Sequence, residues 1–210
     1  MKERGMIFNG EMVRAILDGR KTQTRRPIKW KQTRFTEIGE REDGSKWPWS
    51  EDAEHACDFW HPCPFGDVGD RIWVREAFRV HSRATDVATL VYKASERNSW
   101  TEQTHRVPVA VCNKPATPEK WTPSLHMPRW ASRILLEITD VRVERLNSIS
   151  DADAKAEGCC YGRGGGIPDF AVNPADHFPT LWASIYGQES WNANPWVWVI
   201  EFERVEGGAA

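Results

Sequence analysis

The sequence predicts an α+β protein whose mostly antiparallel strands close into a small barrel with helices beside it. Strand-like segments lie far apart along the 210 residues, and helical patterns precede them or separate them. This order lacks the strand–helix–strand alternation of a parallel sheet, so antiparallel pairing is the better match. The length is close to that of one domain, and we expect a single domain over residues 1–210.

The N-terminal segment predicts a short helix followed by extended chain. Asn9 can accept a hydrogen bond from the first turn, and Gly19 can end the helix in a left-handed conformation. Apolar residues recur between them at helical spacing, at Met12, Val13, Ile16 and Leu17. Pro27 then favours extended backbone at Arg26.

Runs rich in β-branched and alternating apolar residues predict five strands, at residues 71–78, 89–93, 107–111, 133–146 and 196–203. Two stretches, near 30–65 and 94–130, are rich in Trp and Pro and show no sustained period. We expect long insertions there, the second of which includes the strand at 107–111.

Two helices are predicted between the last two strands. Ser150 and Asp153 have the spacing of a capping box, which opens a short helix that ends at Gly158. The second helix has an apolar stripe at Phe178, Leu181, Trp182, Ile185 and Tyr186. The glycine-rich loop 162–166 lacks the preceding strand and following helix of a dinucleotide-binding fingerprint.

Composition excludes several classes of protein. A formal net charge of −2 argues against a globally basic nucleic-acid coat protein, and 40% hydrophobic residues argue against disorder. No apolar run approaches the length of a membrane span, and no signal-peptide core follows Met1. Five cysteines, an odd number, indicate reduced thiols. We therefore expect a cytoplasmic protein without membrane contact.

The first 34 residues form a local basic field, with ten Lys or Arg against three acids. Such a run is either a solvated face or a site for phosphate or another anion. The twelve tryptophans allow two interpretations as well, because they can fill a core or stack on bases.

The motif Gly19-Arg20-Lys21-Thr22-x-Thr24-x-Arg26 follows the first helix, and Gly69-Asp70-x-Ile72-x-Val74 follows in the next strand region. This ordered set, with the long strand, the two later helices and the closing strand, resembles the ASCH domain family. The resemblance implies a barrel like that of the PUA RNA-binding domain. The long, Trp-rich form looks like the ASCH-type proteins of phages and prophages.

The resemblance implies binding of RNA or of a modified nucleoside or nucleotide, and no cofactor. One branch of the family consists of amidohydrolases that remove the acyl group from N4-acetylcytidine and similar amides. Carried over by motif, Lys21 is the base, Thr24 the nucleophile and Glu157 the proton donor. A non-catalytic RNA-binding protein and a host-interaction protein of phage origin remain alternatives, so enzyme activity stays open.

The proposed triad is chemically coherent. A threonine hydroxyl needs a base, and the cations Arg20, Arg25 and Arg26 are expected to lower the pKa of Lys21 by like charge. A helix C-terminus disfavours a carboxylate, which suits Glu157 as an acid. Residues three apart in a strand face opposite ways, so the triad needs a bend or a helical turn between Lys21 and Thr24.

Nucleotide or RNA binding is assigned to charged and aromatic residues near the motif and before the long strand. They are Arg20, Arg25, Arg26, Arg75, Glu76, His126, Arg129 and Trp130. Trp130 as core and Arg75 and Glu76 as an outward strand pair are the alternatives.

A metal site is the weaker interpretation of the cysteines. Cys57, His61 and Cys63 are compact, and a thiol from the adjacent pair Cys159-Cys160 could complete four ligands, but the spacing matches no common zinc motif. Buried thiols are the simpler expectation. No Gly-x-Ser-x-Gly nucleophile elbow occurs in the sequence.

Overall fold

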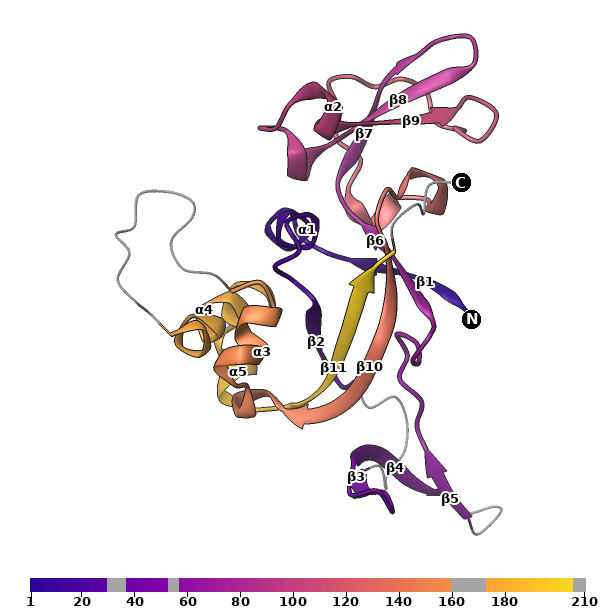
Figure 1. Ribbon diagram of the computed structural model, residues 1–210. Coiled ribbons are helices and arrows are strands. Elements are labelled where there is room, and N and C mark those ends of the chain that lie inside the picture. The colour runs from indigo at the N-terminus through magenta and orange to yellow at the C-terminus, as the bar shows by residue number, and fades with distance from the viewer. Residues whose placement is uncertain (30–36, 53–56, 160–172, 206–210) are drawn as a thin grey trace. The chain divides into compact units, whose positions relative to one another are not determined.

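The computed structural model describes residues 1–29, 37–52, 57–159 and 173–205. The chain divides into two compact units, and each combines segments from distant parts of the sequence (Figure 1). The first unit comprises residues 1–19, 69–137 and 203–210, and the second comprises residues 20–68 and 138–202. The expectation of a single domain over 1–210 stays a prediction.

The first unit contains a strand pair with a helix and a separate three-stranded sheet. Its elements are β1 (Glu3–Ile7), α1 (Gly10–Leu17), β6 (Arg71–Arg75), β7 (Phe78–Arg83), β8 (Val87–Tyr92), η1 (Lys93–Ser95), α2 (Trp100–Gln103), β9 (Thr104–Pro108), η2 (Ser124–His126), η3 (Arg129–Ala131) and the start of β10 (Leu135–Arg145). β6 pairs in parallel with β1 and antiparallel with the first residues of β10. As predicted, the Asn9 side chain caps α1, where it accepts a hydrogen bond from the Met12 amide.

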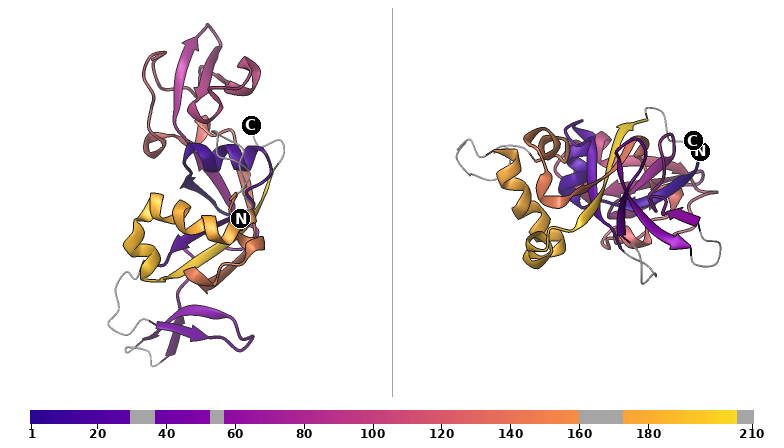
Figure 2. Two further views of the ribbon diagram at one scale, coloured as in Figure 1. Left: turned by 90° about the vertical axis from the view of Figure 1, so that its left-hand side faces the viewer. Right: turned by 90° about the horizontal axis from the view of Figure 1, so that it is seen from below.

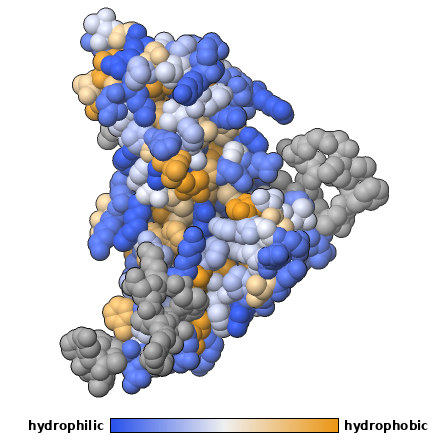
Figure 3. Space-filling model, turned by 180° about the vertical axis from the view of Figure 1, so that it is seen from behind, coloured by the Kyte–Doolittle hydropathy of each residue, from blue (hydrophilic) through white to orange (hydrophobic). Residues whose placement is uncertain are grey.

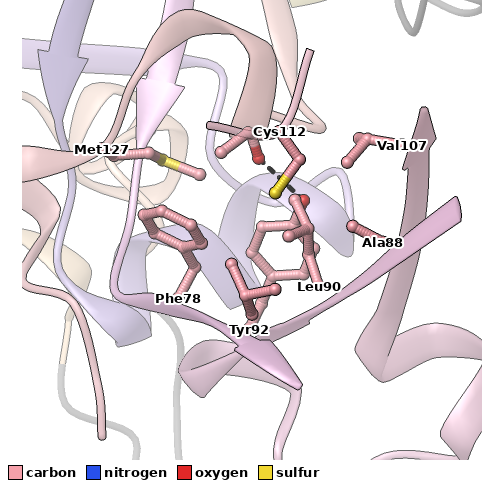
Figure 4. Close-up of a cluster of buried hydrophobic side chains, with 9 residues drawn as sticks. Phe78, Ala88, Leu90, Tyr92, Val107, Cys112 and Met127 are labelled. Atoms are coloured by element: carbon pink, nitrogen blue, oxygen red, sulfur yellow. Dashed lines mark hydrogen bonds between the residues drawn. The ribbon is translucent and has the colours of Figure 1, made fainter. Parts of the chain in front are cut away.

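The antiparallel strands β7, β8 and β9 lie side by side and carry one buried hydrophobic cluster of the first unit on one of their faces (Figure 2). Phe78, Leu90 and Tyr92 are fully buried there, and Met127 packs over them from a later segment (Figure 4). The Tyr92 hydroxyl donates a hydrogen bond of 2.7 Å to the carbonyl of Ala131, so its one polar group is satisfied inside the core.

The second unit contains the strands and helices that hold the candidate site. Its elements are β2 (Gln23–Pro27), β3 (Glu37–Glu40), β4 (Lys46–Asp52), β5 (Cys57–Trp60), the rest of β10, η4 (Leu146–Ser148), α3 (Asp151–Ala156), α4 (Pro174–Tyr186), α5 (Gln188–Asn192) and most of β11 (Trp196–Arg204). β2 pairs antiparallel with β11, and the helices α3, α4 and α5 lie together near the lower ends of β10 and β11 in Figure 1. Phe178 and Trp182 of α4 pack against Val197 and Val199 of β11.

The mixed α+β class with mostly antiparallel sheets is confirmed. Hydrogen bonding orders the main strands β1-β6-β10-β11-β2, and β1–β6 is a parallel pair. Among the described strands no pairing closes this order into a ring. A closed, PUA-like barrel therefore stays a prediction.

Several elements differ from the sequence expectations. The segment 71–78 is two strands, β6 and β7, and the region near 30–65 contains β3, β4 and β5 rather than only loop. Cross-strand partners stabilise these strands, as where Trp49 faces Trp60, and such distant pairs leave no periodicity in the local sequence. β1 and the short helix α5 were also missed, so the described residues between β10 and β11 contain three α-helices rather than two.

None of the described helices has the length and apolar composition needed to cross a membrane. On the face drawn in Figure 3 the hydrophobic residues form small, separate patches among hydrophilic ones.

Replacement of Gly5 by alanine tests the close packing of β1 on β6. Gly5 is paired with Trp73, and a Cβ at residue 5 would lie 2.5 Å from the Trp73 ring. We expect Gly5→Ala to lower the free energy of unfolding by about 1–3 kcal/mol, because the ring has to move. Urea unfolding of the two proteins gives the difference. In the control Gly10→Ala the new Cβ meets nothing closer than 3.5 Å, and an equal loss there would contradict the explanation.

Candidate acid–base site in the second unit

Two neighbouring elements of the second unit bring Lys21 and Glu157 together. Lys21 lies just before β2, and Glu157 caps the C-terminal end of α3, which opens with the predicted capping box of Ser150 and Asp153. The two residues form an isolated antiparallel bridge, and the Thr22 amide donates a 2.8 Å hydrogen bond to the carbonyl of Ala156. The end of α3 is therefore fixed against the start of β2 by backbone hydrogen bonds.

The side chains of Lys21 and Glu157 form a buried ion pair. Lys21 Nζ lies 2.7 Å from Glu157 Oε2, and the two side chains are 0% and 3% exposed. The same Nζ donates hydrogen bonds of 2.7 Å to the carbonyl of Gln23 and 2.9 Å to that of Glu157. The three hydrogen-bond donors of the ammonium group therefore each have an acceptor.

Arg25 extends this pair into a wider network of charges. One of its terminal nitrogens lies 3.5 Å from Glu157 Oε1, and the other lies 3.0 Å from Glu144 and 3.4 Å from Asp153. Asp153 also accepts the hydrogen bond of the Ser150 hydroxyl in the capping box. The first turn of α3 is thereby also in contact with β2.

Arg142 of β10 lies on the other side of these carboxylates. Its guanidinium contacts Asp140, Glu144, Asp153 and Glu201. The whole cluster contains three cations, Lys21, Arg25 and Arg142, and five carboxylates, a formal balance of −2.

This balance changes the interpretation of the basic N-terminal field. Lys21 and Arg25 are buried and paired with acids that are more than 100 positions away in the sequence. Arg4 and Arg14 belong to the first unit, where Arg4 pairs with Asp70. Lys31 and Arg34 lie outside the described residues. The charges counted in the sequence therefore do not form one exposed anion patch.

Thr24 is not linked to the ion pair. It is 1% exposed on β2 and is paired with Ile200. Strand alternation places it on the opposite face of β2 from Gln23 and Arg25. Among the described residues no hydrogen bond connects Thr24 with Lys21 or Glu157. Two of the three predicted catalytic residues are thus in contact, and the third lies on the neighbouring strand face.

Two buried nitrogen atoms beside the ion pair lack an acceptor. Gln23 Nε2 and Arg25 Nε make no hydrogen bond, although Gln23 and Arg25 are 1% and 3% exposed. Both residues lie on the same face of β2. Most buried donors in proteins have a partner, so these two nitrogens are exceptions, as is Arg79 Nε in the first unit.

Burial is the main reason why the pKa of Lys21 is lowered. Desolvation disfavours the ammonium form, Glu157 opposes this effect, and the like charge of Arg26 adds a smaller lowering. The expected direction is therefore present, but it comes from burial more than from the neighbouring arginines.

The other predicted binding residues of the second unit lie around this cluster. Arg20 is exposed, and its guanidinium donates a hydrogen bond of 3.3 Å to the carbonyl of Gly158. Arg26 is half-buried, and its guanidinium lies 3.5 Å from the hydroxyl of Tyr186 on α4.

The remaining predicted binding residues belong to the first unit and have structural partners there. Glu76 is buried and pairs with Arg133 at 2.9 Å, and burial raises the pKa of Glu76. Arg129 pairs with Glu3, and Trp130 packs edge-on against Phe78. Arg75 stacks on Trp73 and bonds to the carbonyl of Leu125, and His126 is exposed.

Sequence reasoning missed Gln23, Arg142, Glu144 and Asp153 as parts of the site. Arg142 and Glu144 alternate on one face of β10, a pattern that is equally typical of a solvated strand. Asp153 was recognised only as a helix cap. The local sequence does not show that acids far away along the chain form ion pairs with residues of β2.

The cysteine and histidine cluster is placed differently from a metal site. Cys57 is exposed, Cys63 is buried, and His61 Nε2 lies 2.9 Å from the hydroxyl of Ser50. Within the described ranges no group of three or more His, Cys, Asp or Glu residues is arranged to hold a metal ion. Cys160 lies outside those ranges.

Removing one member of the ion pair is expected to destabilise the protein more than removing both. Glu157→Gln should lower the free energy of unfolding by about 3–5 kcal/mol, because a buried ammonium loses its partner. The double variant Lys21→Met with Glu157→Gln should recover most of this loss. Urea unfolding measures both. Arg4→Ala, which breaks a partly exposed pair, should cost less than about 1 kcal/mol. If the double variant is as unstable as the single one, the ion pair is needed by the fold.

The lowered pKa of Lys21 also predicts a pH dependence of stability. Between that pKa and the ordinary value of 10.5, the unfolded chain binds a proton that the folded chain does not. The free energy of unfolding of the wild type should therefore rise with pH in this window relative to that of Lys21→Met. Thermal unfolding of both proteins over this range measures the difference. A difference that falls with pH would contradict the lowered pKa.

Comparisons of the chain with family models, with curated proteins and with solved structures found no match. The resemblance to the ASCH family therefore stays a prediction that rests on the motif residues, and the function has to be argued from the site.

Proposed function

We propose that this chain binds a neutral pyrimidine nucleoside with an acylated exocyclic nitrogen and hydrolyses its amide. The observation that carries the proposal is the buried pair of Lys21 and Glu157. Burying an ion pair costs desolvation energy, and apolar residues of similar size would often serve the fold as well. A buried acid beside a buried base with a shifted pKa is typical of a functional site.

A single proton transfer within the pair gives the two protonation states that the proposed chemistry needs. A base must be a neutral amine and a proton donor must be a carboxylic acid. Transfer of one proton from Lys21 Nζ to Glu157 Oε2, across the 2.7 Å hydrogen bond, gives both forms at once without a change in total charge. On the Lys21 side of this transfer, burial disfavours the ammonium form and lowers the pKa of Lys21.

The surroundings favour a neutral, carbonyl-bearing ligand over a phosphate. The cluster has two more carboxylates than cations, so a phosphate would be repelled. Gln23 Nε2 and Arg25 Nε are buried donors that need acceptors, and carbonyl oxygens of a pyrimidine or an acyl group can supply them.

The proposed reaction requires the Thr24 hydroxyl to reach the acyl group from the opposite face of β2. The Thr24 hydroxyl oxygen attacks the acyl carbon while Lys21 takes the hydroxyl proton. The carbon–nitrogen bond breaks, and Glu157 gives its proton to the departing exocyclic nitrogen. Water then attacks the threonine ester and gives a proton to Glu157, and Lys21 returns its proton to the Thr24 oxygen. The carboxylic acid is released and the neutral pair is restored.

Turnover of N4-acetylcytidine by the purified protein tests the proposal. We expect release of cytidine and acetate, and a loss of kcat/KM of about a hundredfold or more in Lys21→Ala and in Thr24→Val. Thr22→Val is the matched control, because Thr22 is exposed and lies two residues away. Activity that survives in Thr24→Val would exclude a threonine nucleophile.

A second candidate function is binding without hydrolysis, and the position of Thr24 favours it. A threonine on the face of β2 opposite Gln23 and Arg25 is not placed to react with a carbonyl held by their side chains. In this case the chain would bind a modified nucleoside or a nucleotide in RNA, and the Lys21–Glu157 pair would recognise its polar edge.

Salt dependence separates the two candidates. A neutral nucleoside releases no counterions, so KM for N4-acetylcytidine should stay nearly constant as salt is raised. If the partner is RNA held by the exposed Arg20 and the half-buried Arg26, the double variant Arg20→Ala with Arg26→Ala should reduce the log–log salt slope of binding by roughly 0.7 for each phosphate that it no longer neutralises. A steep slope that this variant flattens would favour the RNA-binding function.

A further inference from the structure

One face of the sheet β7–β9 in the first unit is mostly polar, although Val91 on this face is fully buried. Phe78, Leu90 and Val107 point into the core, and strand alternation sends their neighbours to the other face. The strand register aligns two cross-strand rows there, Arg79–Val91–Thr104 and Ser82–Thr89–Arg106. Neither row contains a carboxylate.

Two tryptophans border these rows. Phe78 bridges to Thr122, which brings Trp121 beside Arg79, and the Arg79 guanidinium lies 4.5 Å from the centre of the Trp121 ring. Trp100 is 53% exposed at the start of α2 and packs edge-on with His81 of β7 at 5.0 Å. These residues, with Arg106, are here called the β7–β9 face, and Figure 1 labels the three strands that carry or border them.

Local structure holds Trp100 in place. The capping box of Ser99 and Glu102 opens α2, and the Gln103 side chain donates hydrogen bonds to the carbonyls of Glu96 and Asn98. A large aromatic ring that is half exposed on a well-tied turn offers a preformed surface for stacking.

The positive charge of this face has no partner in the described structure. No carboxylate pairs with Arg79 or Arg106 among the described residues, and the Arg79 guanidinium is held by stacking. Over residues 78–123, seven Lys or Arg stand against four Asp or Glu. The second unit shows the opposite pattern, because Lys21 and Arg25 are matched by acids there.

We propose that the β7–β9 face binds single-stranded nucleic acid. Arginines would contact the phosphates, and bases would stack on Trp100 and on the guanidinium plane that covers Trp121. A nucleic acid strand alternates phosphates with bases, which matches cations that lie beside flat aromatic and guanidinium surfaces. The carboxylates of an acidic peptide could contact the cations but could not stack on the flat surfaces. This inference does not rest on the proposed hydrolysis, since it concerns other residues in the other unit.

Fluorescence anisotropy with labelled twelve-nucleotide oligo-U and oligo-dT, at several salt concentrations, tests the proposal on the full-length protein. Trp100→Ala should weaken binding about fivefold to a hundredfold, as expected for the loss of one stacked base. Arg106→Glu should weaken binding and lower the salt slope by roughly 0.7. Both residues are exposed, so circular dichroism should show unchanged folding.

The control is Lys2→Glu, which makes the same charge change in the first unit outside the three-stranded sheet and should weaken binding much less. Polyglutamate is the competitor for simple polyanion binding. Tighter binding of oligo-U than of oligo-dT would identify RNA, and the reverse would identify DNA. The proposal is overturned if neither oligonucleotide binds at low salt, if polyglutamate competes equally well, or if Trp100→Ala leaves the affinity unchanged.

Discussion

The buried contact between Lys21 and Glu157 is the interaction on which the candidate site depends. It joins Lys21, two residues before β2, to Glu157, the C-cap residue of α3, and three acceptors surround the ammonium group. Backbone hydrogen bonds between the same segments hold the two side chains in register. Burying both charges costs desolvation free energy, and their mutual attraction offsets this cost only while Glu157 lies beside Lys21. The position of α3, which holds Glu157, is therefore coupled to the charge state of Lys21.

The charge network of the second unit also bears on the charge of the ligand that we propose for it. Arg25 and Arg142 share the carboxylates of Glu144 and Asp153, so their charges are neutralised within the protein. A count of charges over the first 34 residues assigns Arg25 to a basic field. Its acidic partners lie on β10 and α3, far away in the sequence, so the count does not include them. The unpaired cations lie instead on the β7–β9 face of the first unit. We therefore propose a neutral ligand for the first of these places and a polyanion for the second.

Prediction from sequence succeeded where the signal is local. The cap at Asn9, the capping box at Ser150 and the apolar stripe of α4 each depend on residues within a few positions of one another, and each gave a helix. Strands β3 to β5 were missed because their stability comes from cross-strand contacts such as Trp49 with Trp60. The closing of the sheet also depends on distant pairing, and a barrel stays a prediction.

The site was only partly predictable for the same reason. Lys21 and Glu157 were placed together by resemblance to a family motif, and no local pattern in the sequence connects them. Their contact is present, while Thr24 follows the alternation of β2 and lies on its other face. Arg142 and Asp153 had ordinary local explanations, as a strand residue and a helix cap, that concealed their shared contact.

Titration of Lys21 is the decisive measurement for the hypothesis that Lys21 and Glu157 form a poised acid–base pair. In protein labelled with nitrogen-15 at the lysine side chains, NMR can follow Nζ of Lys21 with pH, and Lys21→Met assigns its signal. We predict that this ammonium group loses its proton below the ordinary pKa of 10.5, because burial disfavours its charge. A Lys21 signal that titrates at or above 10.5 would contradict the hypothesis and leave the pair as a structural ion pair.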